Sequence, residues 1–187
     1  MRISRAGLGI AVVLSVWAVA GCSRGSKGPD VQALVSDLRS PKESVRGAAG
    51  VKLIEVGEPA APAVAELLKD PDPHMRHVGA TTLWSMGVKA RPAVGPLAEA
   101  LSDESGEVRV AAGMALQGLG PAGEPAVPAL RKALKDKDGA VAREAAKALG
   151  NIGPAAAAAI PDLKYAARSD YLRAVADEAI LRIQAPR

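Results

Sequence analysis

The sequence predicts an all-α fold, a right-handed α-solenoid of about five helix-turn-helix repeats. Two observations carry this prediction. Hydrophobic residues make up 49% of the 187 residues, yet aromatic residues make up 2% and Phe is absent. Helices packed through Ala and Leu can bury such a core, whereas strands favour β-branched and aromatic side chains. The second observation is a segment that recurs along the chain with apolar residues at fixed offsets.

The N-terminus predicts export and a lipid anchor. Residues 1–5 are basic and residues 6–20 are mostly apolar. This apolar run suits a secretory signal and falls short of the roughly 20 residues of a transmembrane helix. Val19-Ala20-Gly21-Cys22 resembles the lipobox of bacterial lipoproteins, in which the chain is cut before the Cys and the thiol and the new amino group are acylated. The alternative is an ordinary signal that leaves Cys22 as a free thiol.

We expect four parts in the chain: a signal peptide (1–21), the lipidated Cys22 with a flexible tether (22–30), a repeat domain (31–184) and a tail (185–187). The tether SRGSKGP is rich in Gly and Ser, which favours flexibility. Ser23 follows the Cys where inner-membrane lipoproteins often carry Asp. The resemblance therefore implies anchoring in the cell envelope, at the periplasmic face of the outer membrane if the organism has two membranes.

The second helix of each repeat is predicted from a recurring apolar pattern. Four segments end in Gly (45–57, 75–87, 108–120 and 141–153), and a fifth, 172–184, has the pattern without the Gly. Apolar residues recur at offsets 0, 4, 8 and 11 and so form one face of a helix. The terminal Gly residues suit the left-handed region after a helix end. The small residue at offset 4 lets a neighbouring helix approach closely.

A first helix of about ten residues is predicted ahead of each of these segments. Pro59, Pro92 and Pro125 lie near the starts, where a missing N–H costs little, and later prolines such as Pro128 predict a delayed start or a kink. Acidic turns join the two helices, and Asp72 before Pro73 is a good N-cap. The connection between the first two copies is three residues shorter than the next two, so we expect a local change of curvature there.

These repeats resemble the HEAT family, specifically its short bacterial form related to phycobilisome-lyase repeats. The resemblance is carried by strings such as DPDPHMRHVGATTLWSMG and DESGEVRVAAGMALQGLG, and it covers about 31–184. It implies an Asp six residues before an Arg, linking turns within and between repeats, as in Asp70 with Arg76 and Asp103 with Arg109. The other copies depart from the pattern at Ser40 before Arg46, at Ala142 followed by Arg143, and at Ala167 before Arg173.

Catalytic, cofactor and metal sites are not predicted, and we expect the protein not to be an enzyme. No phosphate-binding Gly loop or nucleophile elbow is present, and the single Cys allows no intrachain disulfide. His74 and His77, with Asp70 and Asp72 nearby, allow a metal site, but a solvated helix start is the preferred interpretation. Without its signal the chain has 22 basic and 20 acidic residues, which argues against nucleic-acid binding.

A partner-binding surface is predicted at offsets 2, 6 and 9 of the second helices, which lie away from the core stripe. Exposed apolar residues often mark interaction sites, and Trp and Met are favoured there. The candidate residues are Val51, Ile54, His77, Trp84, Val110, Met114, Arg143 and Lys147. We interpret them as a groove for an apolar or extended peptide with an acidic end. The alternatives are packing of Trp84 and Ile54 against the following loop, and tighter packing between repeats at Val110 and Met114.

The leading hypothesis for function is therefore a membrane-anchored scaffold or adaptor that binds a protein or peptide in the cell envelope. The alternative, implied by the resemblance, is a lyase-type protein or another accessory subunit of an enzyme. The lipid anchor, the small size and the scarcity of aromatic residues to hold a bilin argue against a lyase.

Replacing Cys22 with Ser removes the acylated thiol, so the Cys22→Ser protein should be released from membranes. Each buried methylene of an acyl chain contributes about 0.8 kcal/mol, and more than one chain makes attachment stable. Fractionation of cells that express the wild-type and variant proteins measures this effect. Unchanged membrane association of the variant would contradict the lipid anchor.

Overall fold

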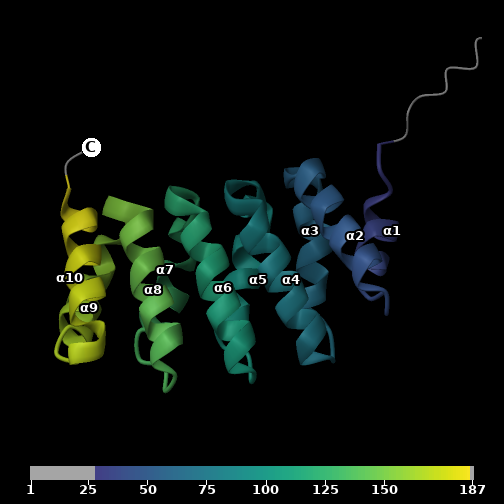
Figure 1. The fold of residues 1–187 in the computed structure, drawn as a ribbon. Coiled ribbons are helices and arrows are strands. Elements are labelled where there is room, and N and C mark those ends of the chain that lie inside the picture. The colour runs from purple at the N-terminus through teal and green to yellow at the C-terminus, as the bar shows by residue number, and fades with distance from the viewer. Residues whose placement is uncertain (1–27, 186–187) are drawn as a thin grey trace, which may run out of the picture.

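The computed structural model describes residues 28–185, and it confirms the predicted all-α solenoid within that range. Every regular element between these residues is an α-helix or a 3-10 helix. The repeats follow one another along one axis from α1 to α10 (Figure 1). The predicted signal sequence, Cys22 and most of the tether lie outside the described residues. None of the described helices is long and apolar enough to cross a bilayer.

Each repeat pairs a first helix with a second helix. The second helices are α2 (Glu43–Val56), α4 (Pro73–Met86), α6 (Gly106–Gly118), α8 (Gly139–Ile152) and α10 (Asp170–Gln184). The first helices are α1 (Val31–Asp37), α3 (Ala61–Ala65) continued by η2 (Glu66–Lys69), α5 (Val94–Ala100), α7 (Val127–Ala133) and α9 (Ile160–Ala166). The second helices from α4 to α10 pack side by side and form one layer, and each also packs on the first helix of its own repeat.

The core runs between these two layers along the whole array. Most of the predicted stripe is buried, including all four of its positions in α4 and α8, and in α6 together with Leu119, the residue after that helix. Val64, Leu97, Leu130 and Leu163 occupy the same position in successive first helices and are fully buried. Small residues permit this close packing: a Cβ added to Gly79 of α4 would lie 2.8 Å from the Cβ of Leu67.

The first helices differ from the prediction of one helix of about ten residues. Each α-helical part has five to seven residues, and from the second repeat on a 3-10 helix precedes it: η1 (Glu58–Ala60), η3 (Gly87–Ala93), η4 (Gly120–Ala126) and η5 (Gly153–Ala159). Prolines explain the division, because Pro92 and Pro125 lie inside 3-10 segments and cannot donate a helical hydrogen bond. Pro128 lies in the first turn of α7, where the loss costs little.

The glycines that end the second helices have positive φ, as predicted, but not the left-handed helical backbone that was expected. Gly57, Gly87 and Gly153 combine φ of 73°, 56° and 76° with ψ of -136°, -133° and -144°. This is the mirror image of the extended region, which only Gly enters readily. The chain therefore reverses sharply at one residue and starts the next 3-10 segment at once.

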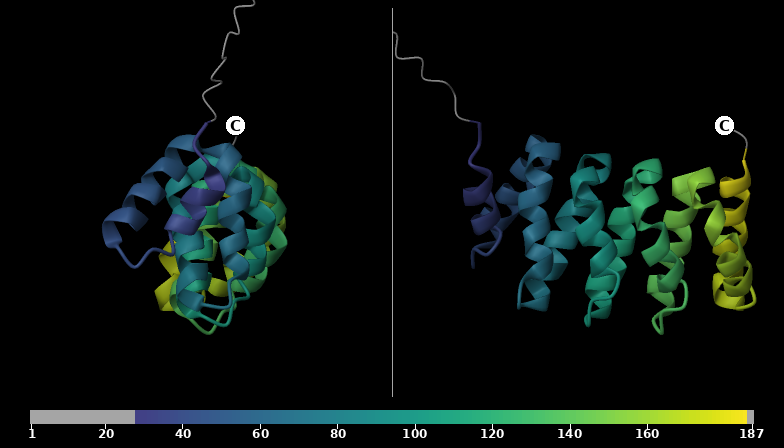
Figure 2. Two further views of the ribbon diagram at one scale, coloured as in Figure 1. Left: turned by 90° about the vertical axis from the view of Figure 1, so that its right-hand side faces the viewer. Right: turned by 180° about the vertical axis from the view of Figure 1, so that it is seen from behind.

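The short connection between the first two repeats changes the direction of α2, which supports the predicted change in the array. The 3-10 segment η1 has three residues where η3, η4 and η5 each have seven. Seen along the axis (Figure 2, left), α2 turns away from the direction that the later second helices share. Contact between α2 and α4 is correspondingly sparse.

Replacing Gly87 with Ala should lower the free energy of unfolding by about 1–3 kcal/mol, the usual range for a residue forced into such a backbone region. Nothing lies within 4 Å of the added Cβ, so the effect isolates backbone strain. Gly50→Ala is the matched control, because Gly50 lies inside α2 with ordinary φ and open space. The free energy of unfolding of this control variant should rise by about 0.5–1 kcal/mol. Urea unfolding measures both, and equal stability of the two variants would contradict the strained turn.

Candidate functional site

Two arginines hold consecutive repeats together at the edge where first and second helices are joined. Arg76 donates from Nε and Nη2 to the two carboxylate oxygens of Asp103 in the next repeat, at 2.8 and 3.0 Å. Its Nη1 donates to the main-chain oxygen of Asp70, six residues earlier, at 2.9 Å. Arg109 repeats this arrangement with the carboxylate of Asp136 and the main-chain oxygen of Asp103. We call these two linkages the arginine ladder.

The aspartates of the ladder also shape their own turns. Asp70, Asp103 and Asp136 each accept a hydrogen bond from the N–H two residues later, at 2.8–2.9 Å. Asp70 is buried, and the N–H of Asp72 and the guanidinium of Arg39 hold its pKa below the ordinary value of 3.8. One carboxylate thus fixes a turn and receives the arginine of the preceding repeat, so turn geometry and repeat spacing are set together.

The ladder is altered at both ends of the array. In the first repeat Arg46 binds only the main-chain oxygens of Ser40 and Pro41, and Arg39 pairs with Asp70 in its place. The turned α2 explains this, because Arg46 is carried by that helix. In the fourth repeat Ala142 replaces the arginine.

Other contacts join the fourth and fifth repeats where the ladder is absent. The guanidinium of Arg143 lies 5.6 Å from the ring centroid of Tyr171. The same ring packs on Gly139, whose added Cβ would lie 2.9 Å from it. Asp162 of α9 pairs with Arg131 at 2.6 Å and with Lys135 at 3.2 Å, and the bond from Arg131 lowers the pKa of Asp162. An aromatic ring and a first-helix ion pair thus replace the missing arginine.

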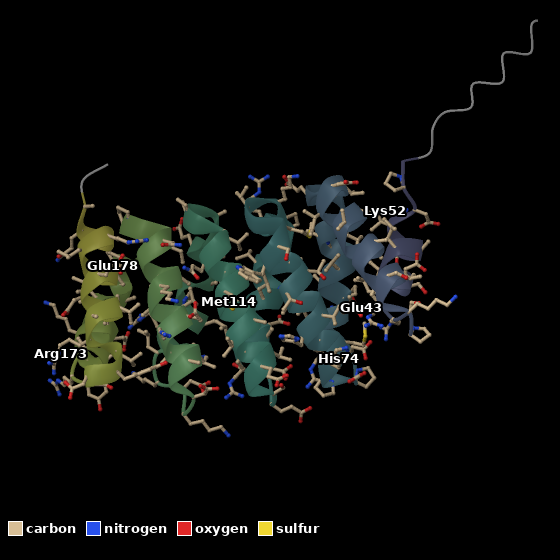
Figure 3. The ribbon with its side chains drawn as sticks, in the orientation of Figure 1. Glu43, Lys52, His74, Met114, Arg173 and Glu178 are labelled. Atoms are coloured by element: carbon tan, nitrogen blue, oxygen red, sulfur yellow. The ribbon has the colours of Figure 1, made fainter. Side chains whose placement is uncertain are left out.

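The outward side of the second helices, which we call the second-helix face, carries a groove between α4 and α6. His77 and Trp84 of α4 and Val110 and Met114 of α6 line it, and its volume is about 560 Å³. The structure therefore brings four of the predicted residues together. The Trp84 side chain is 45% exposed, whereas His77, Val110 and Met114 are half-buried. Met114 lies midway along the array on α6, and Glu178 lies on α10 of the same layer (Figure 3).

The remaining predicted residues lie apart from this groove. Val51 is exposed and Ile54 is half-buried on α2, which points away from α4. The predicted basic end is already engaged within the protein. Arg143 stacks on Tyr171, and the Lys147 ammonium lies 2.8 Å from the Glu144 carboxylate. The Glu144 carboxylate thus offsets the charge of Lys147, whereas stacking on Tyr171 leaves the Arg143 guanidinium charged.

Acidic residues at the groove were missed by the sequence analysis. Glu107 of α6 and Asp138, the N-cap of α8, line the groove beside the apolar residues. Extending the stripe of offsets 2, 6 and 9 backwards by three residues reaches Glu107, so the same periodicity contained the signal. Asp138 belongs to the next repeat, and only the lateral packing of α6 against α8 brings it near.

The two histidines do not form a metal site with their neighbours. His74 is exposed at the start of α4. Its main-chain N–H donates to the carboxylate of Asp72 at 2.9 Å, as the predicted N-cap requires. His77 is half-buried one turn later. No group of three or more His, Cys, Asp or Glu side chains within residues 28–185 is placed to hold a metal ion.

Comparison with known proteins supports the repeat assignment. Residues 92–183, which span the last three repeats, match the family model of HEAT repeats. No curated protein sequence matches the chain significantly. Among solved structures, the complex of CpcE and CpcF of phycocyanin lyase from Nostoc is similar, with a TM-score of 0.65 and 20% identity over 81% of this chain and 96% of that chain. At 20% identity, this likeness shows a shared fold and nothing about function.

Two designed proteins are also similar in structure. An engineered protein matches with a TM-score of 0.61 and 24% identity, over 82% of this chain and 79% of that chain. A designed armadillo repeat protein, solved in complex with the peptide (KR)4, matches with a TM-score of 0.59 and 21% identity, over 84% and 83% of the two chains. These likenesses show that the chain has the fold of a helical repeat solenoid.

The lowered pKa of Asp70 predicts acid sensitivity. A carboxylate with a depressed folded-state pKa stabilises the fold above its unfolded value, and this contribution is lost as the pH falls through the folded value. The Asp70→Asn variant should be less stable at neutral pH, by about 1.5 kcal/mol for a lost charge-assisted hydrogen bond. It should also lose less stability than wild type below pH 3.8.

Urea unfolding across a series of pH values measures this difference. Glu66→Gln is the control, because Glu66 forms an exposed pair with Lys69 and should change little. Parallel pH profiles for wild type and Asp70→Asn would show that Asp70 does not carry the acid sensitivity.

Proposed function

We propose that this chain is a lipid-anchored, HEAT-like repeat protein of the bacterial cell envelope that binds a protein or peptide partner through its second-helix face. The single observation that carries the binding part is the groove between α4 and α6. Trp84, Val110 and Met114 gather there at partly exposed positions, although the buried core lies on the other side of the same helices. Partly exposed Trp and Met are favoured in protein interfaces.

The groove is built on a rigid support, which favours binding. The α4 and α6 helices pack directly against each other, and the arginine ladder fixes their turns by Arg76 and Asp103. A partner therefore meets side chains that are already held in place, so it loses little affinity to the ordering of this surface.

The charges around the groove favour a partner with an apolar side chain next to a basic one. Glu107 is exposed and Asp138 is half-buried beside Trp84 and Met114. Opposite charge across an interface fixes the register and speeds association. The peptide (KR)4 bound by the designed armadillo protein is of this basic kind, although it belongs to that protein alone.

The location in the envelope rests on the sequence pattern around Cys22. A short basic segment, an apolar run and Val-Ala-Gly before the only cysteine together support a lipid anchor. The Gly/Ser-rich tether then joins the anchor to the array. This arrangement keeps a binding surface close to a membrane, which suits an adaptor. The likeness to the phycocyanin lyase complex is one of fold and adds no catalytic residues.

A Trp84→Ala, Met114→Glu double variant should lose its partner. Aromatic anchors at interface centres contribute about 2 kcal/mol or more, so affinity should fall by about 30-fold or more. The mature protein serves as bait in an envelope extract, and circular dichroism checks that helicity is unchanged. The matched control is Val88→Glu, which changes an exposed apolar residue outside the second-helix face and outside the first helices.

The pattern of capture separates the outcomes. Retention by wild type and the control, with loss in the Trp84 and Met114 variant, supports the groove. Equal retention by all three baits would move the site to another surface of the array. Capture by none of them would contradict the adaptor role.

A further inference from the structure

The outer surface of the first helices changes in charge along the array. At the N-terminal end, α1 and its N-cap carry Asp30 and Asp37. At the other end, five cations lie on α7 and α9 or within two residues of their ends, with Asp162 as the acidic residue on these two helices; the turn after α7 also holds Asp136, Lys137 and Asp138. The five cations are Arg131, Lys132, Lys135, Lys164 and Arg168. We call them the basic patch.

The basic patch is only partly neutralised within the protein. Asp162 pairs with Arg131 and Lys135, so these three residues together keep one net positive charge. Lys132 and Lys164 are exposed and take part in no ion pair among residues 28–185. They point away from the core, because Leu130 and Leu163 of the same helices are fully buried. Several cations therefore face solvent on one side of the last two repeats.

An exposed aromatic residue lies within this patch. The Tyr165 side chain is 62% exposed, and the Arg168 guanidinium lies 5.3 Å from its ring centroid. Tyrosine favours membrane interfaces because its ring is apolar and its hydroxyl can stay in water. Lys and Arg beside such a ring add attraction to anionic headgroups, which strengthens binding about fivefold per residue near a charged bilayer.

We propose that the basic patch rests on an anionic lipid surface, so that the array is held at both ends. This inference rests on the lipid anchor of the proposed function. The nine residues from Cys22 to Val31 span at most about 30 Å, which keeps α1 near the bilayer. Repeats packed at about 8–10 Å intervals place α7 and α9 roughly 24–40 Å along the array from α1. An array lying on its first helices then touches the membrane at the anchor and at the patch.

This orientation determines which surface remains available. The second helices form the opposite layer, so the groove of Trp84 and Met114 faces away from the bilayer. Attachment at the anchor alone would let the array swing about its tether. Contact at the basic patch removes that freedom and presents the groove to a partner in the surrounding compartment.

The test uses the mature chain with Cys22→Ser, which keeps all five repeats but cannot be acylated. Its co-sedimentation is measured with phosphatidylcholine vesicles and with vesicles that contain phosphatidylglycerol. The protein should bind the anionic vesicles only, and added salt should weaken this binding. A Lys132→Glu, Lys164→Glu, Arg168→Glu variant should bind more than about 100-fold more weakly, since each lost cation accounts for about fivefold.

The control variant Lys69→Glu, Lys89→Glu, Arg91→Glu has the same net charge and changes exposed cations of the second and third repeats. This control variant should bind the anionic vesicles nearly as well as the protein with an unchanged basic patch. If both variants lose binding to anionic vesicles equally, net charge alone explains the binding and the proposal is overturned. Failure to bind anionic vesicles would also overturn it, and binding to polyglutamate in that case would indicate an acidic protein partner. Mass spectrometry of the Cys22 peptide tests the anchor separately.

Discussion

Each repeat of this protein depends on its neighbours to bury its apolar stripe. With no Phe and few aromatic residues, one pair of helices has little bulk with which to form a core. The helices must approach closely, and small residues such as Gly79 against Leu67 make this possible. Because stability comes from stacking, it is a property of the array and not of any single repeat. The continuous surfaces of the two layers follow from the same constraint.

Much of this architecture could be predicted from the sequence because it depends on periodicity. The stripe at offsets 0, 4, 8 and 11 is set by the helical repeat, and the buried positions of α6 and α8 follow it. The N-cap at Asp72 and the positive φ of Gly87 follow from the local chemistry of single residues. The backbone region after the helix was predicted wrongly, because φ reflects the residue type whereas ψ is set by the 3-10 segment that follows.

The candidate site was less accessible to sequence reasoning, since it depends on contacts between repeats. His77, Trp84, Val110 and Met114 do lie together, as their shared offsets indicated. The fate of Arg143 and Lys147 could not be read in the same way. Tyr171 lies 28 positions after Arg143, and their stacking depends on how α10 sits against α8. Glu144, by contrast, was visible three residues before Lys147 and already offered it a partner.

The short η1, with three residues where η3, η4 and η5 each have seven, has a consequence for any long ligand. From α4 to α10 neighbouring second helices pack side by side, so an extended partner can contact four successive second helices. This side-by-side packing ends at α2, because α2 has a different direction from the later second helices. For such a partner, the shared layer of second helices ends at α4. The first repeat therefore limits the length of the second-helix face that one extended partner can contact.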